Sequence, residues 1–263
     1  MNNFFTARKG LTEAIASTFR KNYPTFFPNL PFFQEWAIGD FGLYEDGVFI
    51  KKGNLADLGV QYDCSPPHNM QGMFFNCSSA HTSCQEFGGQ ADSKISPVKP
   101  TLSVKLEQEN AYFCRGALAS QLSLLDPSKA MERHLNFLKT HKAWDTNYCI
   151  ISSVYMARNF IFMAAIGNAV QASAELNYTP TTPSSAEAAV FSQAAVHYDI
   201  TKKTNIGHII CTSADTPQVV ACMQMLKLKR GNLMNYKGLG APPREVVSLD
   251  EEEQFYVLSI VDE

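Results

Sequence analysis

The sequence has few charged residues. Asp, Glu, Lys and Arg make up 18 % of the 263 residues, below the usual share of roughly one quarter. The net charge of −3 and the pI near 6.1 do not favour a nucleic-acid partner. No stretch reaches the roughly 18–20 apolar residues of a membrane-spanning helix, because the longest, residues 160–170, is interrupted by Gly167 and Asn168.

The N-terminal residues lack a basic leader followed by an apolar core, so no signal peptide is expected. The seven cysteines are an odd number in a long chain, which is not typical of a secreted disulfide framework. We therefore expect a cytoplasmic protein with free thiols. Hydrophobic residues make up 45 % of the chain, enough for a sizeable core.

Apolar periodicity predicts a helix over residues 11–23 that Pro24 cannot continue. A second helix is expected to begin after Asp126, which suits an N-cap before Pro127. A third, short helix is expected over residues 186–193. The predicted apolar face of the second helix consists of Ala130, Met131, His134, Leu135 and Leu138.

Alternating and β-branched runs predict most of the remaining elements as strands. Asp46-Gly47 lies between two β-prone runs and predicts a hairpin. Residues 148–166 are expected to form two strands or one long bent strand, with residues 169–176 paired to it. Together these patterns predict an α+β fold, with a twisted, mostly antiparallel central sheet, flanking helices and a short C-terminal tail. Other expected strands cover residues 101–107, 195–200, 206–212 and 255–261, and residues 111–121 are expected to form a second strand or the start of a helix.

The charge distribution divides the chain at the Gly/Pro-rich joint of residues 238–243. Residues 238–263 contain seven acidic residues and one basic residue, a net charge of −6. Since the whole chain carries −3, residues 1–237 carry +3. We predict a single body over residues 1–237 and an acidic tail over residues 238–263. The tail is either a solvated C-terminus with an edge strand or a removable autoinhibitory peptide. The predicted cleavage or hinge residues are Gly238, Leu239, Gly240 and Ala241, and the apolar tail residues are Phe255, Val257, Leu258 and Ile260.

One polar region contains residue types that bind zinc. The candidates have spacings C-x3-H and C-x3-H-x2-C, and thiolates with imidazoles suit a tetrahedral zinc ion. No C-x2-C knuckle is present, and the alternative is a polar loop whose cysteines act as small hydrophobic residues. The candidate ligands are Cys64, His68, Cys77, His81 and Cys84.

No local signature of an enzyme is present, and neither catalytic residues nor a cofactor are expected. G-x-S-x-G is absent. The remaining cysteines lie in apolar runs typical of a core. His197 and His208 are expected to face each other across a hairpin. Asp40, in a chance D-F-G tripeptide, and Asp57 are expected to be structural caps.

In overall layout the chain resembles the bacterial gasdermins. The resemblance rests on the strand pattern through residues 101–121, 148–176 and 195–212 and on the joint before a short tail. It implies an inhibitory C-terminal peptide that a partner protease removes, and a body that then oligomerises into a membrane pore in antiviral defence. The family often carries an acylated N-terminal cysteine, and residues 2–7 contain none.

A pore hairpin needs about ten residues in each strand and one apolar face. Residues 101–121 and 195–212 are long enough, but any antiparallel sheet with one wet face alternates in the same way. The alternatives are a structural or assembly protein, such as a virion or scaffold component that forms homo-oligomers, and a zinc protein. The partners expected of a pore-forming protein are membrane lipid, further copies of itself and an activating protease. The predicted hairpin tips are Glu109, Asn110, Lys202 and Lys203.

Overall fold

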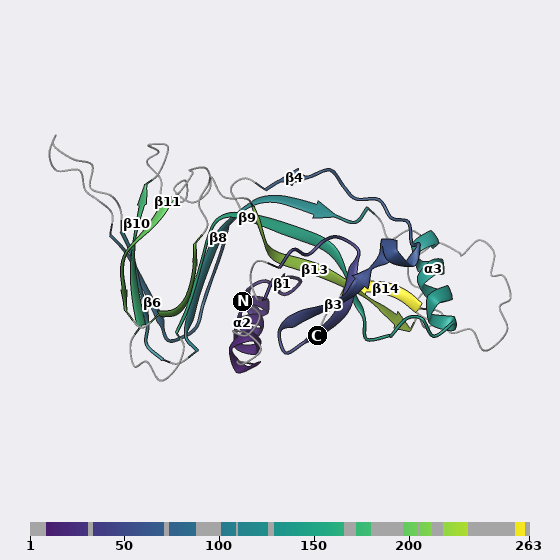
Figure 1. The fold of residues 1–263 in the computed structure, drawn as a ribbon, viewed down its shortest axis with the longest axis horizontal. Helices are drawn as coiled ribbons and strands as arrows, with labels where there is room; N and C mark the ends of the chain where they lie inside the picture. Colours follow the sequence, from purple (N-terminus) through teal and green to yellow (C-terminus); the bar gives the residue numbers. More distant parts are fainter. Residues whose placement is uncertain are drawn as a thin grey trace, which may run out of the picture.

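Two antiparallel sheets and two α-helices make up the part of the protein that the structure describes (Figure 1). The structure is a computed structural model. Every strand pairing in the described residues is antiparallel, so the fold is sheet-rich and mostly antiparallel. The described residues are 9–30, 34–70, 74–87, 101–108, 110–125, 129–165, 172–179, 197–204, 206–211, 218–230 and 256–260.

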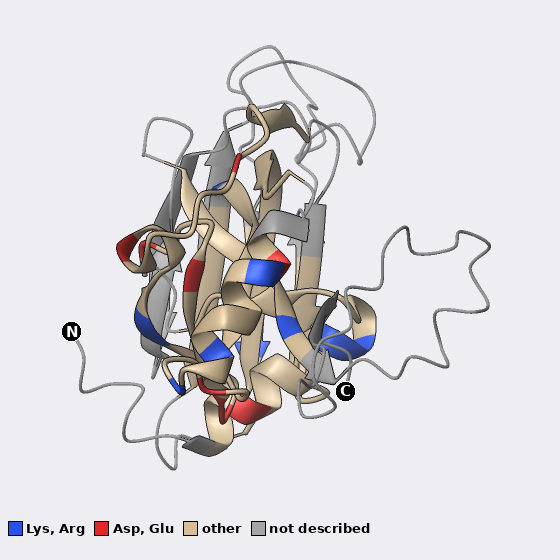
Figure 2. Cartoon of the chain, turned by 90° about the vertical axis from the view of Figure 1, so that its right-hand side faces the viewer, with Lys and Arg blue, Asp and Glu red and all other residues tan. Residues whose placement is uncertain are grey.

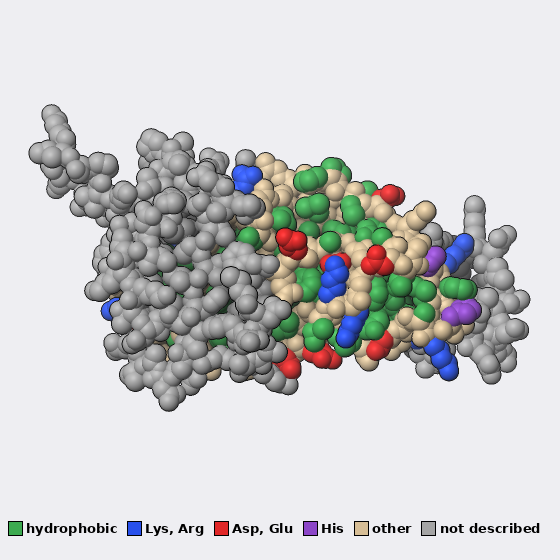
Figure 3. All heavy atoms as spheres, in the orientation of Figure 1, with side chains coloured by type: hydrophobic (Ala, Val, Ile, Leu, Met, Phe, Trp, Pro, Cys, Tyr) green, Lys and Arg blue, Asp and Glu red, His purple; other side chains and the backbone are tan. Residues whose placement is uncertain are grey.

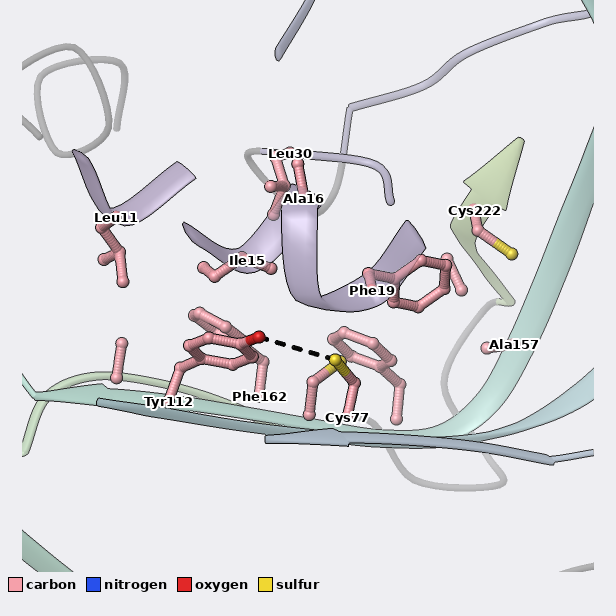
Figure 4. Close-up of a cluster of buried hydrophobic side chains, with 14 of the residues drawn as sticks. Leu11, Ile15, Ala16, Phe19, Leu30, Cys77, Tyr112, Ala157, Phe162 and Cys222 are labelled. Carbon is pink, nitrogen blue, oxygen red and sulfur yellow. Dashed lines mark hydrogen bonds between the residues drawn. The ribbon is translucent and has the colours of Figure 1, made fainter. Parts of the chain in front are cut away.

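The predicted first helix is confirmed as α2 (Lys9–Asn22). Leu11, Ile15 and Phe19 are at most 3 % exposed, because residues four apart share one face of a helix. Pro24 follows the last turn, where it cannot continue the helix. Figure 4 shows these side chains pointing from α2 toward the aromatic rings of the larger sheet.

The hairpin predicted at Asp46-Gly47 is confirmed by β2 (Asp40–Glu45) and β3 (Val48–Asn54). Asp46 has φ 54° and Gly47 has φ 80°. Two consecutive left-handed residues form the turn that matches the natural twist of a hairpin. A 3-10 helix, η1 (Leu55–Leu58), follows where one helical turn was expected.

The longest strand, β9 (Cys149–Ala165), is the spine of the larger sheet and is one continuous strand of 17 residues. On one edge it pairs first with β13 (Val219–Arg230) and then with β12 (Ile206–Cys211). On the other edge it pairs with β2 and then with β8 (Tyr112–Ser123). The outer strands are β4 (His68–Asn69) and β5 (Phe74–Ser78) on β8, and β1 (Phe27–Pro28) and β14 (Tyr256–Ile260) on β13.

The smaller sheet has the strand order β11-β10-β7-β6. Each of its strands is a chain neighbour of one strand in the series β12-β9-β8-β5 of the larger sheet. Only residue 205 lies between β11 and β12. In Figure 1 the result is one sheet folded over on itself, with β6, β10 and β11 on one limb and β8 and β9 on the other. The strands of the smaller sheet are β6 (Thr82–Phe87), β7 (Thr101–Leu106), β10 (Ala172–Thr179) and β11 (His197–Thr204).

The two faces of the β8–β9 region carry different side chains. One face packs against α2 in a cluster that includes Tyr112, Cys114 and Phe162 (Figure 4). Since side chains alternate along a strand, Phe113 and Ile161 lie on the opposite face, where both are at most 1 % exposed. That face lies toward the folded-over strands, because β7 contacts β8 and β10 contacts β12. The buried row that β7 contributes is Leu102, Val104 and Leu106, each 0 % exposed.

The second helix, α3 (Lys129–Thr140), packs beside β14 at the other end of the larger sheet. Met131 and Leu135 are buried there against Trp144, as the periodicity predicted. His134 is exposed, so its assignment to the apolar face was wrong. At 100° per residue it lies about 60° from Met131 around the helix, where the helix faces solvent. Asp126 and residues 186–193 lie outside the described residues.

Three predicted strand pairings were wrong, although the strands themselves were confirmed. Within the described residues, β7 and β8 do not pair with each other, and neither do β11 and β12. β10 pairs with β7 and β11 rather than with β9. In each case the chain crosses to the other layer instead of turning back beside itself. Lys202 and Lys203 therefore lie inside β11, opposite Glu175 and Ala174, and not at a hairpin tip.

Candidate functional site

The buried thiols are poor nucleophiles. Cys77, Cys114 and Cys222 belong to the cluster under α2 and are at most 3 % exposed. Burial raises the pKa of all three thiols, and a reactive cysteine requires the opposite shift. The side chains act as small apolar residues that fill the space between α2 and the sheet.

The five zinc-ligand candidates are not brought together. In the described part of the chain, which includes all five, no group of three His, Cys, Asp or Glu side chains could hold a metal ion. Cys77 is buried in β5, whereas Cys84 is exposed in β6 of the other sheet. His68 lies opposite Gln121, near the end of β8 that is farther from the bend between the two sheets. The candidate ligands stay apart because the chain between Cys77 and Cys84 crosses from one sheet to the other.

The expected histidine pair does not form either. The register places His197 opposite Thr179 and His208 opposite Ala164, in different sheets. The predicted pairing depended on the hairpin over residues 195–212, and the strands of that region have separate partners. Within the described residues, these two positions are not cross-strand neighbours.

Of the two carboxylates expected to be caps, Asp57 has that role, whereas Asp40 belongs to a buried polar network. Asp57 accepts a hydrogen bond from Asn54 N at 3.1 Å and closes a capping box at η1. Asp40 is fully buried and its carboxylate lies 2.7 Å from Lys51 Nζ. It also accepts hydrogen bonds from Ala37 N and Asn54 Nδ2. A buried charge needs this degree of compensation, so the network fixes the hairpin base rather than a ligand.

A polar ladder crosses the larger sheet, and the sequence analysis missed it. Tyr155 Oη accepts a hydrogen bond from Gln121 Nε2 at 3.0 Å and donates one to Gln224 Oε1 at 3.2 Å. The Gln224 amide reaches Thr25 at 3.3 Å, just beyond α2. Burial raises the pKa of Tyr155 to about 12, so the phenol is neither an acid nor a base near neutral pH. Polar residues two apart in β8 and β9 are the sequence signal that could have revealed this ladder.

The C-terminal strand lies on the edge of β13. Its register places Leu258 opposite Leu228 and Ile260 opposite Leu226. Both leucines of β13 are at most 9 % exposed. The expected C-terminal strand is therefore confirmed, with Val257 opposite Lys229. The expected tail residue Phe255, the hinge residues Gly238, Leu239, Gly240 and Ala241, and the hairpin-tip residue Glu109 lie outside the described residues, while Asn110 has φ 63° before β8.

The feature with the clearest potential for a change of shape is the folded-over sheet. β7 alternates between the fully buried Leu102, Val104 and Leu106 and the more accessible Ser103 and Lys105. The register continues this order, with Ala174 opposite Val104 and Leu176 opposite Leu102. β7 therefore has one apolar face and one polar face.

Comparisons with protein-family models, curated proteins and solved structures find no match to this chain. Among the described residues, no helix combines the length and the apolar character needed to cross a membrane.

Proposed function

We propose that this chain is a membrane pore-forming effector, held inactive by its C-terminal segment and activated when a protease cuts between Gly238 and Ala241. It acts without enzymatic chemistry, self-associates after cleavage and moves from the cytoplasm to a membrane. The observation that carries the proposal is the folded-over sheet, in which four strands of one layer continue along the chain into four strands of the other.

Straightening these folds would convert stacked layers into long hairpins. β7 and β8 have 6 and 12 residues, and β9 and β10 have 17 and 8. A membrane-spanning strand needs about 9–11 residues. The pairs β6–β7 and β10–β11 would become the ends of two neighbouring hairpins, with residues 88–100 and 180–196 as their tips. The tip positions differ from those predicted from sequence because the strand pairings differ.

The buried row of β7 supplies a reason for the inactive state to be stable. Leu102, Val104 and Leu106 are fully buried, and each apolar side chain gains roughly 1.5–3 kcal/mol from leaving water. In the inserted state lipid would replace the protein around these side chains. A body with a twisted central sheet, flanking helices and a separable tail fits this exchange.

The C-terminal strand supports the inhibitory part of the proposal. β14 covers the edge of β13 and lies beside α3. An open edge exposes unpaired backbone groups that another chain can pair with. Removing the tail would therefore free an edge for self-association.

The test is proteolysis in the presence of vesicles. Residues 238–241 are replaced by the recognition sequence of a site-specific protease, and release of an entrapped dye from anionic vesicles is measured before and after cutting. A scrambled recognition sequence is the matched control. We expect release only from the chain that is cut, and equal release from both chains would contradict the proposal.

A disulfide between β13 and β14 distinguishes cleavage of the chain from release of its C-terminal tail. Lys227 and Ser259 are directly opposite in the β13–β14 ladder, and cross-strand Cα distances of about 4.5–5.5 Å suit a disulfide. The variant Lys227→Cys with Ser259→Cys carries Cys149→Ser, because Cys149 lies opposite Lys227 on β9. It also carries Cys64→Ser and Cys84→Ser, because those two thiols are exposed. The cut, oxidised chain should release no dye, and a reductant should restore release. Full release from the oxidised chain would show that β14 does not inhibit.

A further inference from the structure

The outward face of α3 combines an exposed aromatic ring with basic side chains. Phe137 is 58 % exposed, the largest value among the exposed large hydrophobic side chains. At 100° per residue, it lies at the centre of the solvent-facing arc. Figure 3 shows histidine and basic side chains beside hydrophobic ones at the end of the molecule where Figure 1 places α3. The exposed residues of the arc are Arg133, His134, Phe137, Thr140 and His141.

No carboxylate lies on this arc. Glu132 is half-buried on the flank of α3, more than a quarter turn from Phe137. Arg133 and His134 make no ion pair within the part of the chain that the structure describes. Lys142, exposed just beyond the helix, adds a second full positive charge. Figure 2 shows the basic segments of α3 facing the viewer. The face is therefore cationic around an apolar centre.

The ring of Phe137 is held in position. Its centroid lies 4.0 Å from that of His141, with an interplanar angle of 36°. His141 Nδ1 in turn lies 2.8 Å from Phe137 O, at the last turn of the helix. A side chain that is already ordered loses less conformational entropy when it is buried by a partner. Packing of α3 on the body does not use Phe137, because the buried side of the helix already contains Met131 and Leu135.

We propose that this α3 face, with Phe137 at its centre and Arg133 and Lys142 around it, docks the intact chain on an anionic phospholipid bilayer. Aromatic rings favour the headgroup level of a bilayer, and basic side chains are attracted to anionic lipid. A second copy is a poor occupant, since a two-fold contact would bring the same cations face to face. The inference rests on the membrane function proposed above and adds the surface that makes first contact.

The experiment measures binding of the full, uncut chain to vesicles by co-sedimentation. Vesicles of phosphatidylcholine are compared with vesicles that also contain about 30 % phosphatidylserine. We expect Phe137→Ala to lower the partition coefficient on anionic vesicles about tenfold. Arg133→Gln and Lys142→Gln should each lower it about fivefold, with no effect on neutral vesicles.

Two variants keep this test specific. Phe137→Trp should retain binding, and its added fluorescence should shift to shorter wavelength on anionic vesicles, since the native Trp36 and Trp144 are already buried. Ile50→Ala is the matched control, because Ile50 is 41 % exposed beside Lys51 and Lys52 on β3. It should change binding less than about twofold. An equal loss in Ile50→Ala would overturn the assignment to α3.

The remaining outcomes also decide the matter. Absence of binding to anionic vesicles, or full binding by Phe137→Ala, overturns the proposal, as does a wild-type dimer in sedimentation that Phe137→Ala dissolves. Dye release by the cut chain tests the pore separately. If the chain docks through α3 but the cut chain releases no dye, the docking surface is supported and the pore is contradicted. If Phe137→Ala docks and releases dye normally, the pore is supported and the docking surface is contradicted.

Discussion

The β8–β9 region is covered on one face by α2 and on the other by the folded-over strands, and the two covers are built differently. The α2 face contains aromatic rings, thiols and directed polar contacts. Cys77 Sγ of β5 lies 3.6 Å from Tyr112 Oη of β8 beneath the helix, and Thr12 Oγ1 of α2 donates to Asp46 O in the β2–β3 turn at 2.8 Å. The opposite face lies toward the folded-over strands (Figure 1), where the buried row of β7 is aliphatic: Leu102, Val104 and Leu106.

This difference indicates how each cover is held. A helix whose shape and hydrogen bonds match a sheet is fixed in one position. A strand layer held by aliphatic side chains is stabilised by the hydrophobic effect, which has no preferred direction. A second apolar surface can therefore replace those contacts. The α2 face thus resists change, whereas the folded-over layer is the part that the proposed pore formation would use.

The largest difference is expected from truncating one core side chain on each face. Phe162→Ala under α2 should lower the free energy of unfolding by about 4 kcal/mol. Leu102→Ala in β7 should lower it by only about 2–3 kcal/mol, because the smaller layer can close over the cavity. Both side chains are fully buried. Denaturant unfolding at neutral pH, monitored by tryptophan fluorescence, gives both values.

The comparison depends on the order of the two losses. Val104→Ala, beside Leu102 on the same buried row, serves as a second probe of the folded-over layer. If both β7 variants lost as much as Phe162→Ala, the folded-over layer would be packed as rigidly as α2. The distinction between the two covers would then disappear.

Alkaline pH should weaken the α2 face selectively. Burial raises the pKa of Cys114 and Cys222 above their usual range. Below about pH 8 both states keep the proton, so stability is unchanged; above it the unfolded chain releases protons that the folded chain holds. Each thiol then costs about 1.4 kcal/mol per pH unit. We expect a loss of about 3 kcal/mol between pH 8 and 10, measured by denaturant unfolding with reductant present.

Removing one thiol calibrates this effect. Cys222→Ala should reduce the pH-dependent loss by about one third to one half, whatever its effect on stability at pH 7, because Cys77 and Cys114 remain buried. Cys64→Ala, at an exposed position, should leave most of the loss in place. A wild-type stability that stays constant from pH 8 to 10 would show that the thiols under α2 are not held protonated by burial.

Local patterns in the sequence were enough to predict the elements but not their partners. The helix at residues 11–23, the Asp46-Gly47 hairpin and the strand at residues 101–107 depend on nearest neighbours, and all were confirmed. The partner of β7 could not be predicted in the same way. Alternation is identical whether the chain turns back beside itself or crosses to a second layer.

The same limitation explains the candidate zinc site. Cys77, His81 and Cys84 are close in sequence, but β5 and β6 belong to different sheets, so the spacing does not bring the ligands together. The polar ladder through Tyr155 was missed for the opposite reason. Its members are up to 199 residues apart, and only the assembled sheet brings them together.

The smallest expected effect comes from two glycines with the same backbone conformation. Gly47 has φ +80° in the hairpin turn, and an added Cβ would lie 2.5 Å from Thr12 O of α2. Gly59 has φ +75°, and an added Cβ would meet nothing within 4 Å. Gly59→Ala should therefore cost only the left-handed backbone term of about 1 kcal/mol.

Gly47→Ala should cost about 2–3 kcal/mol, because the turn must also move away from α2. Denaturant unfolding of the two variants measures the difference, and Gly59→Ala is the matched control for backbone strain. The excess reports how tightly the β2–β3 turn is held against α2. Equal losses would mean that α2 can shift at no cost, and that the cover on this face is as adaptable as the folded-over strands.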